Sequence, residues 1–247
     1  SGATGGNSVL TVYKVDQQNY GVHLNGATFK FYKFDKDAGT WDAGTEVTTQ
    51  ADGKFQYSPE SMLSGNVKPE YDTLYKLVEE TAPAGYTKSD AEYYFIWLAK
   101  GKTNTDDAYR TAVGNHTPIG SSAVTYYKHG TSGTVYIPNK RDGLVIEKKW
   151  ENKDGSEMTN PPVNAIKVQL WKFKKSMTKT DAEFDQEIEL TKDKGWSVVL
   201  KNLDPDYYYY VKEITDLGEN YTVSYGTTNE GRLTGTITIT NRSTTDS

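Results

Sequence analysis

The chain has 247 residues, a formal net charge of −5, 19 tyrosines and no cysteine. This length suits two domains of roughly 100 to 140 residues, each able to bury its own core. The negative charge argues against nucleic acid or an anionic membrane as the main partner.

The composition favours strands over helices, because Tyr, Thr and Val are abundant and Gly is frequent. We therefore expect an all-β protein. The sequence holds no apolar run of about 18 residues and does not open on an apolar leader, so we expect neither a membrane span nor a signal peptide in it. The absence of cysteine does not distinguish a cytosolic from an extracellular location.

Apolar side chains that recur at every second position predict strands in the first half of the chain. Leu10, Val12 and Lys14 share one strand face, and Val135, Ile137 and Asn139 share another. The predicted strands include 8–16, 27–34, 55–57, 93–99, 123–127 and 134–139. A further strand begins at Tyr75 and ends at the turn 82–85. Together they form a first domain over 8–142.

An insert at about 100–133 interrupts this domain. It is mostly polar and rich in turn residues. A segment of this length exceeds a hairpin connection, so we expect either a functional loop or a mobile insert.

The second half of the chain repeats the pattern after a four-residue linker, 140–143. Alternation predicts strands over 144–150, 166–172, 195–200, 207–213, 221–225 and 234–241. These strands form a second domain over 143–245, and the short linker predicts stiff coupling between the two domains.

Each half places an acid where a core residue is expected. Tyr75, Leu77 and Glu79 share one strand face, whereas Glu80 falls on the other. Glu213 likewise shares a face with Tyr209 and Val211. A buried carboxylate is costly without partners, so two in matching contexts indicate a repeated site.

The same core-facing rows hold a lysine on the first strand and an asparagine on the last strand of each half. The two sets are Lys14, Glu79 and Asn139 in the first half, and Lys148, Glu213 and Asn241 in the second. If the first and last strands are neighbours, the amine and the amide meet beside the acid.

The chemistry of such a set follows from burial. Burial lowers the pKa of a lysine from about 10.4 and raises that of a glutamic acid from about 4.3, so the two can coexist as neutral amine and neutral acid. The amine is then a nucleophile. The acid can polarise the asparagine carbonyl and pass a proton to the leaving ammonia, which yields a Lys–Asn isopeptide bond.

The motifs around these residues resemble those of collagen-binding-protein B-type (CnaB-like) domains of Gram-positive pilins and surface adhesins. They are VYK at Lys14, LVEETAPAGY at Glu79, YIPN at Asn139, IEKKW at Lys148, YVKE followed by ENYTVSY at Glu213, and ITITN at Asn241. The resemblance covers nearly the whole chain apart from the first eight residues and the insert. It implies two tandem inverse immunoglobulin-like β-sandwiches, in which lysine and asparagine cross-link spontaneously with the acid as catalyst.

This resemblance implies a structural or adhesive segment of a cell wall-anchored, extracellular protein. Shaft pilins of this kind usually carry a sortase-reactive lysine just before the last-strand asparagine, but here that place reads VYIPN, and the sequence shows no sortase signal at its end. We therefore expect an accessory pilin or adhesin stalk that is not an enzyme beyond its own single-turnover cross-linking. Its expected partners are other pilus subunits, through sortase linkage, and a host matrix or cell-surface ligand.

Alternative interpretations remain open at this point. The insert could contact a host ligand, and the run 207–210 with the tryptophans could form a carbohydrate-binding module, although consecutive tyrosines point alternately in and out of a strand. Lys14 and Lys148 could be edge-strand lysines that oppose aggregation. No cofactor or metal is expected: the acidic stretch 35–42 lacks the terminal glutamate of a calcium loop, and His23, His116 and His129 lack ligand spacing.

Overall fold

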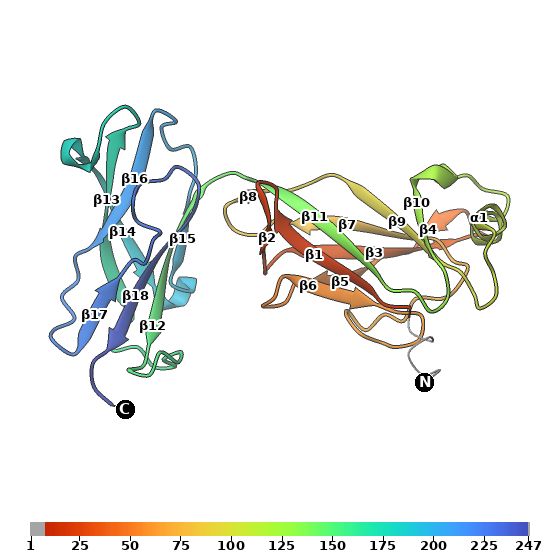
Figure 1. Ribbon diagram of the computed structural model, residues 1–247, viewed down its shortest axis with the longest axis horizontal. Helices are drawn as coiled ribbons and strands as arrows, with labels where there is room; N and C mark the ends of the chain where they lie inside the picture. Colours follow the sequence, from red (N-terminus) through yellow and green to blue (C-terminus); the bar gives the residue numbers. More distant parts are fainter. Residues whose placement is uncertain (1–7, 247) are drawn as a thin grey trace. The chain divides into compact units, whose positions relative to one another are not determined.

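The computed structural model describes residues 8–246. The chain divides into two compact units, one up to Lys140 and one from Arg141 (Figure 1). The expected all-β fold is confirmed, because residues 8–246 form two β-sheets around a hydrophobic core in each unit. Among the described residues, no helix has the length and apolar character needed to cross a bilayer.

The described residues of the first unit form eleven strands. They are β1 (Leu10–Asp16), β2 (Asn19–His23), β3 (Thr28–Asp35), β4 (Thr40–Trp41), β5 (Thr45–Thr48), β6 (Lys54–Tyr57), β7 (Tyr75–Thr81), β8 (Tyr86–Thr87), β9 (Glu92–Trp97), β10 (Val124–Tyr127) and β11 (Gly133–Arg141). One sheet has the order β2-β1-β11-β8, with β6 also paired to β1. The other has the order β10-β9-β7-β3-β4, with β5 paired to β3.

The core of this unit lies between the two sheets. Leu10 and Val12 of β1 and Ile137 of β11 pack against aromatic side chains of the facing sheet, such as Phe29 and Phe95. The first and last strands, β1 and β11, are parallel neighbours, with Lys14 opposite Ile137. This adjacency brings the first and last strands together in one sheet, and because they are parallel the chain enters the domain at one end of the pair and leaves at the other.

The insert is a folded part of the first unit, and the sequence analysis missed its helix, α1 (Thr105–Val113). Asn104 caps the helix by accepting a hydrogen bond from the backbone N–H of Asp107 at 3.1 Å, and Gly114 ends it with a φ of 63°. The helix buries four side chains, Ala108, Tyr109, Ala112 and Val113, against side chains that include Phe34, Leu74, Ile96 and Leu98. A short 3₁₀ turn at Ser121–Ala123 then leads into β10, which pairs parallel to β9.

In the second unit, the part of the chain that the structure describes forms seven strands. They are β12 (Leu144–Glu151), β13 (Ala165–Lys174), β14 (Glu183–Thr191), β15 (Ser197–Leu200), β16 (Tyr207–Glu213), β17 (Tyr221–Ser224) and β18 (Gly235–Ser243), with 3₁₀ turns at Lys179–Asp181 and Lys192–Lys194. One sheet has the order β15-β12-β18-β17 and the other β14-β13-β16. The sequence analysis missed β14, whose apolar residues Phe184, Ile188 and Leu190 are separated by polar and charged side chains. As in the first unit, the first and last strands, β12 and β18, are parallel neighbours.

Candidate cross-linking sites

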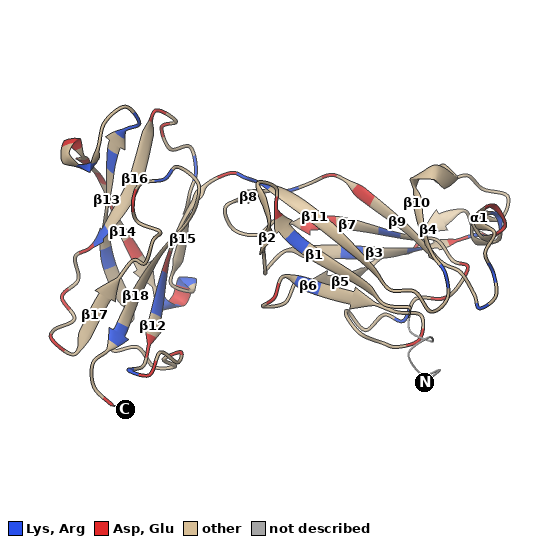
Figure 2. Ribbon diagram, viewed as in Figure 1, with Lys and Arg blue, Asp and Glu red and all other residues tan. Residues whose placement is uncertain are grey.

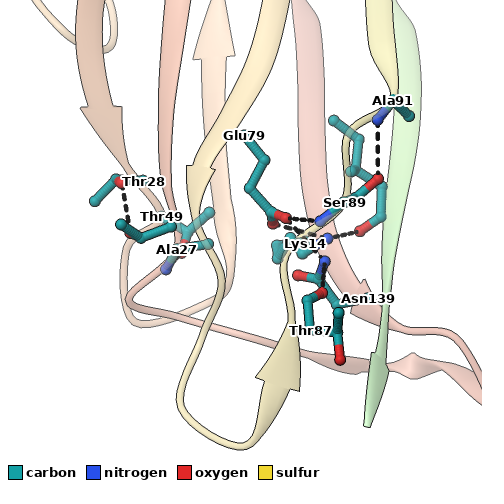
Figure 3. Close-up of polar contacts among 11 residues, drawn as sticks. Lys14, Ala27, Thr28, Thr49, Glu79, Thr87, Ser89, Ala91 and Asn139 are labelled. Atoms are coloured by element: carbon teal, nitrogen blue, oxygen red, sulfur yellow. Dashed lines mark hydrogen bonds and ion pairs between the residues drawn. The ribbon is translucent and has the colours of Figure 1, made fainter. Parts of the chain in front are cut away.

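Three strands place the first predicted set of polar residues in the core of the first unit. Lys14 lies on β1 and Asn139 on the adjacent β11, whereas Glu79 lies on β7 in the facing sheet. Their exposed fractions are 0%, 1% and 2%. Strand alternation turns all three inward, so the structure brings together the three residues that the sequence predicted (Figure 3).

The Lys14 ammonium lies between the acid and the last strand. Its Nζ is 3.3 Å from Glu79 Oε1 and donates a hydrogen bond to the Ile137 carbonyl at 2.8 Å. Glu79 Oε1 is buried and makes no aligned hydrogen bond among the described residues. The contact between the two side chains is therefore an ion pair without hydrogen-bond geometry.

The amide of Asn139 is held through its nitrogen. Nδ2 donates to Glu79 Oε2 at 2.9 Å and to the Thr87 carbonyl of β8 at 3.0 Å, and Oε2 also accepts from the Ser89 N–H at 2.6 Å (Figure 3). Oδ1 of Asn139 is buried and has no hydrogen-bond partner among the described residues. The acid thus contacts the nitrogen of the amide and not the carbonyl, in contrast to the expectation that it polarises the carbonyl.

The second unit repeats the arrangement with one difference. Lys148 Nζ donates to Glu213 Oε2 at 2.9 Å and lies 4.5 Å from the centroid of the Trp150 ring. Asn241 Nδ2 donates to the Thr222 carbonyl at 3.1 Å, and its Oδ1 is again buried without a hydrogen-bond partner in residues 8–246. Here the acid is hydrogen-bonded to the lysine, whereas in the first unit it is hydrogen-bonded to the asparagine.

The strand registers of the two sites match. Lys14 lies opposite Ile137 and Lys148 lies opposite Ile239, so in both units the asparagine is two residues beyond the partner of the lysine. Residues two apart in a strand share a face. The lysine and the asparagine are therefore diagonal neighbours on the inner face of one sheet.

Burial changes the titration of both lysines. It lowers the pKa of Lys14 to about 8, against the opposing attraction of Glu79. It lowers the pKa of Lys148 to about 8 as well, against Glu213. Burial therefore makes the neutral form of each amine easier to reach than it is for an exposed lysine.

The neighbours that could be confused with these residues face solvent. Glu80 is exposed, and the side chain of Lys149 is 62% exposed.

Figure 2 shows other basic and acidic residues interspersed along both units. The acidic stretch at 35–42 spans the turn between β3 and β4, where Asp35 Oδ1 accepts hydrogen bonds from the backbone N–H groups of Asp37 and Ala38.

Sequence reasoning missed the backbone carbonyls of Thr87 and Thr222, because any residue carries such a group. A signal was present nonetheless. Each threonine follows a tyrosine at the start of the strand that flanks the last strand, as Tyr86-Thr87 in β8 and Tyr221-Thr222 in β17. The Tyr-Thr pair is a second repeated feature of the two units.

Comparison with solved structures gives similarities at low sequence identity. One match is the Bacillus anthracis TIE protein, at 13% identity over 96% of this chain and 34% of that chain, with a TM-score of 0.33. Another is the group B streptococcus pilus 2b backbone protein, at 21% identity over 55% of this chain and 41% of that chain, with a TM-score of 0.31. A B repeat unit of the Staphylococcus aureus collagen-binding surface protein also matches, at 16% identity over 97% of this chain and 98% of that chain, with a TM-score of 0.30. The chain thus spans less than half the length of the first two structures. Among curated proteins, no sequence matches significantly.

A family match covers most of the first unit. Residues 8–110 match the family described as "SpaA: Prealbumin-like fold domain". This match takes in Lys14 on β1, Glu79 on β7 and the helix α1 as far as Arg110. Through this domain and its all-β fold, the chain is similar to Gram-positive pilins and adhesins with CnaB-like domains.

Proposed function

We propose that the chain is a tension-carrying segment of a Gram-positive cell-surface protein, in which one Lys–Asn isopeptide bond locks each domain. The observation that supports this proposal most strongly is the repeated arrangement itself. In both units a buried lysine contacts a buried glutamate, and a buried asparagine lies on the parallel neighbouring strand at the same register. Edge-strand lysines that oppose aggregation would instead be exposed.

The proposed reaction is a transamidation. The neutral amine of Lys14 attacks Cγ of Asn139, the Nζ–Cγ bond forms, the Cγ–Nδ2 bond breaks, and ammonia leaves. Glu79 takes a proton from the attacking amine and gives one to the departing nitrogen, so no proton is gained or lost overall. The contact between Glu79 Oε2 and Asn139 Nδ2 at 2.9 Å supports this role, because the acid lies at the leaving group. Lys148, Glu213 and Asn241 take the same roles in the second domain.

The position of each bond suits a protein under tension. Lys14 lies on the first strand of its domain and Asn139 on the last, and the same holds for Lys148 and Asn241. A covalent bond between them would carry force directly from one end of the domain to the other. The strands in between would then bear none of it.

We propose that the protein lies outside the cell, anchored to the cell wall, and is an accessory pilin or adhesin stalk. Its proposed neighbours are other pilus subunits, joined to it by sortase linkage. The alternative of a host-ligand-binding adhesin that acts through the 100–133 insert has less support, because α1 buries four side chains against the sheet. A carbohydrate-binding module is also less supported, since Tyr209 and Tyr210 are both buried.

Peptide mapping tests the proposed bonds. After complete digestion, tandem mass spectrometry should find the peptide of Lys14 joined to that of Asn139, and the peptide of Lys148 joined to that of Asn241. Recovery of all four peptides in linear form would refute the proposal.

A further inference from the structure

A pair of side chains bridges across Asn139 and holds the flanking strand in place. Asp16 is the last residue of β1 and the direct partner of Asn139 in the β1–β11 pairing, and its exposed fraction is 0%. Its Oδ2 accepts a hydrogen bond at 2.7 Å from the hydroxyl of Tyr86, the first residue of β8. Since β1 and β8 lie on opposite sides of β11, this hydrogen bond connects the two strands that flank Asn139.

The strand fixed in this way sets the orientation of the Asn139 amide. Thr87 follows Tyr86, and its carbonyl accepts from Nδ2 at 3.0 Å. If the amide were turned over, Oδ1 would face this carbonyl, and two acceptors would meet without a proton between them. The Thr87 carbonyl therefore selects the orientation in which the nitrogen contacts Glu79. β8 has only two residues, so few ladder hydrogen bonds hold it to β11.

The second unit has an equivalent bridge of different chemistry. Trp150 takes the place of Asp16 as the direct strand partner of Asn241, and Tyr221 takes the place of Tyr86 at the start of the flanking strand. The two rings pack edge to face, with centroids 6.0 Å apart and an interplanar angle of 89°. Thr222, the next residue, again supplies the carbonyl to the asparagine nitrogen.

We propose that Asp16 with Tyr86, and Trp150 with Tyr221, are positioning residues that orient the asparagine amide for cross-linking. This inference rests on the isopeptide bonds proposed above. Neither pair exchanges protons with the reacting atoms. Each acts through the flanking strand, whose threonine carbonyl holds Nδ2, and in the first unit this places the leaving nitrogen at Glu79. The same geometry, reached by a hydrogen bond in one unit and by ring packing in the other, favours a shared role over incidental packing.

The two tyrosines provide a matched pair of variants. Tyr86→Phe removes the hydroxyl that holds Asp16, whereas Tyr221→Phe keeps the ring that packs on Trp150. Each full-length protein is dissolved unfolded from inclusion bodies in urea and refolded by dilution. Samples are quenched over time, and mass spectrometry measures the joined fraction of each lysine–asparagine peptide pair.

In Tyr86→Phe, the Lys14–Asn139 bond should form more slowly by on the order of tenfold, which matches the loss of one buried hydrogen bond. The Lys148–Asn241 bond in the same molecules should form at the wild-type rate. Tyr221→Phe should leave both rates unchanged, and Tyr221→Ala should slow only the second. An unchanged Lys14–Asn139 rate in Tyr86→Phe would overturn the inference.

A spectroscopic measurement separates positioning from general stabilisation. In a Lys14→Met background, where no bond can form, the side-chain amide protons of Asn139 should be protected from hydrogen exchange. Adding Tyr86→Phe should lower that protection while the circular dichroism spectrum stays the same. Unaltered protection would contradict a positioning role. A wild-type protein that forms neither bond would refute the proposed function itself, and the bridges would then be packing features only.

Discussion

Glu79 and Glu80 are adjacent in β7 but lie in opposite environments: Glu79 is 2% exposed inside the sandwich, and Glu80 faces solvent. This difference separates the acid that can serve the reaction from one that cannot. Glu79→Ala should abolish the Lys14–Asn139 bond, because the amine and the amide lose their proton carrier. After correction for the mass difference between Glu and Ala, the protein should then be heavier than wild type by one molecule of ammonia.

The same substitution should destabilise the first domain. By analogy with disulfides that close loops of about 100 residues, loss of the bond should lower the free energy of unfolding by about 4 to 5 kcal/mol. Intact mass and chemical denaturation measure the two effects. Glu80→Ala is the control and should change neither. A Glu80→Ala protein that lacks a bond would show that the assignment by strand parity is wrong.

Lys148 and Lys149 provide the corresponding contrast in the second domain. Lys148 is buried against Glu213, whereas the Lys149 side chain is 62% exposed. Lys148→Ala should lose the second bond and retain the first, since the first domain has its own lysine. Lys149→Ala should retain both. Peptide mapping of the two variants checks this, and loss of a bond in Lys149→Ala would count against the proposed nucleophile.

The rate of bond formation should depend on pH through the lysine–glutamate pair. Reaction needs a neutral amine and a protonated acid, so the pair must hold one proton in total. Burial lowers the pKa of Lys14 and of Lys148 to about 8, so above that pH the pair loses the proton that the leaving nitrogen requires. The rate in refolding experiments should therefore be close to its maximum near pH 7, about half of it near pH 8, and fall about tenfold per pH unit well above that. A rate that instead rises through pH 8 and then levels off would show that amine deprotonation alone is limiting.

Mechanical pulling should reveal the covalent path through each domain. In single-molecule stretching of the wild type, neither domain should extend by the length of the chain between its cross-linked residues before the tether breaks. Asn139→Ala should restore one unfolding step of about 3.5 Å for each residue between Lys14 and Asn139, with the second domain unaffected. A full-length step in the wild type would rule out the proposed role under tension.

The sequence predicted the inner faces of the site strands because alternation is strong there. Lys14, Glu79 and Asn139 each continue an apolar row, so their burial followed from parity. Helix α1 was not predictable in the same way, because its nine residues are mostly polar and its burial depends on a sheet distant in sequence. The repeated Tyr-Thr pair marks the strands that hold Thr87 and Thr222, but the contacts of their carbonyls also depend on which strands lie beside β11 and β18.

The intact mass of the folded wild-type protein tests the central claim most directly. Each isopeptide bond releases one ammonia, so we predict a mass below that of the sequence by two molecules of ammonia. Circular dichroism on the same sample establishes that the protein is folded. A mass equal to that of the sequence in folded protein would contradict the account, because the buried lysines, glutamates and asparagines would then have met without reacting.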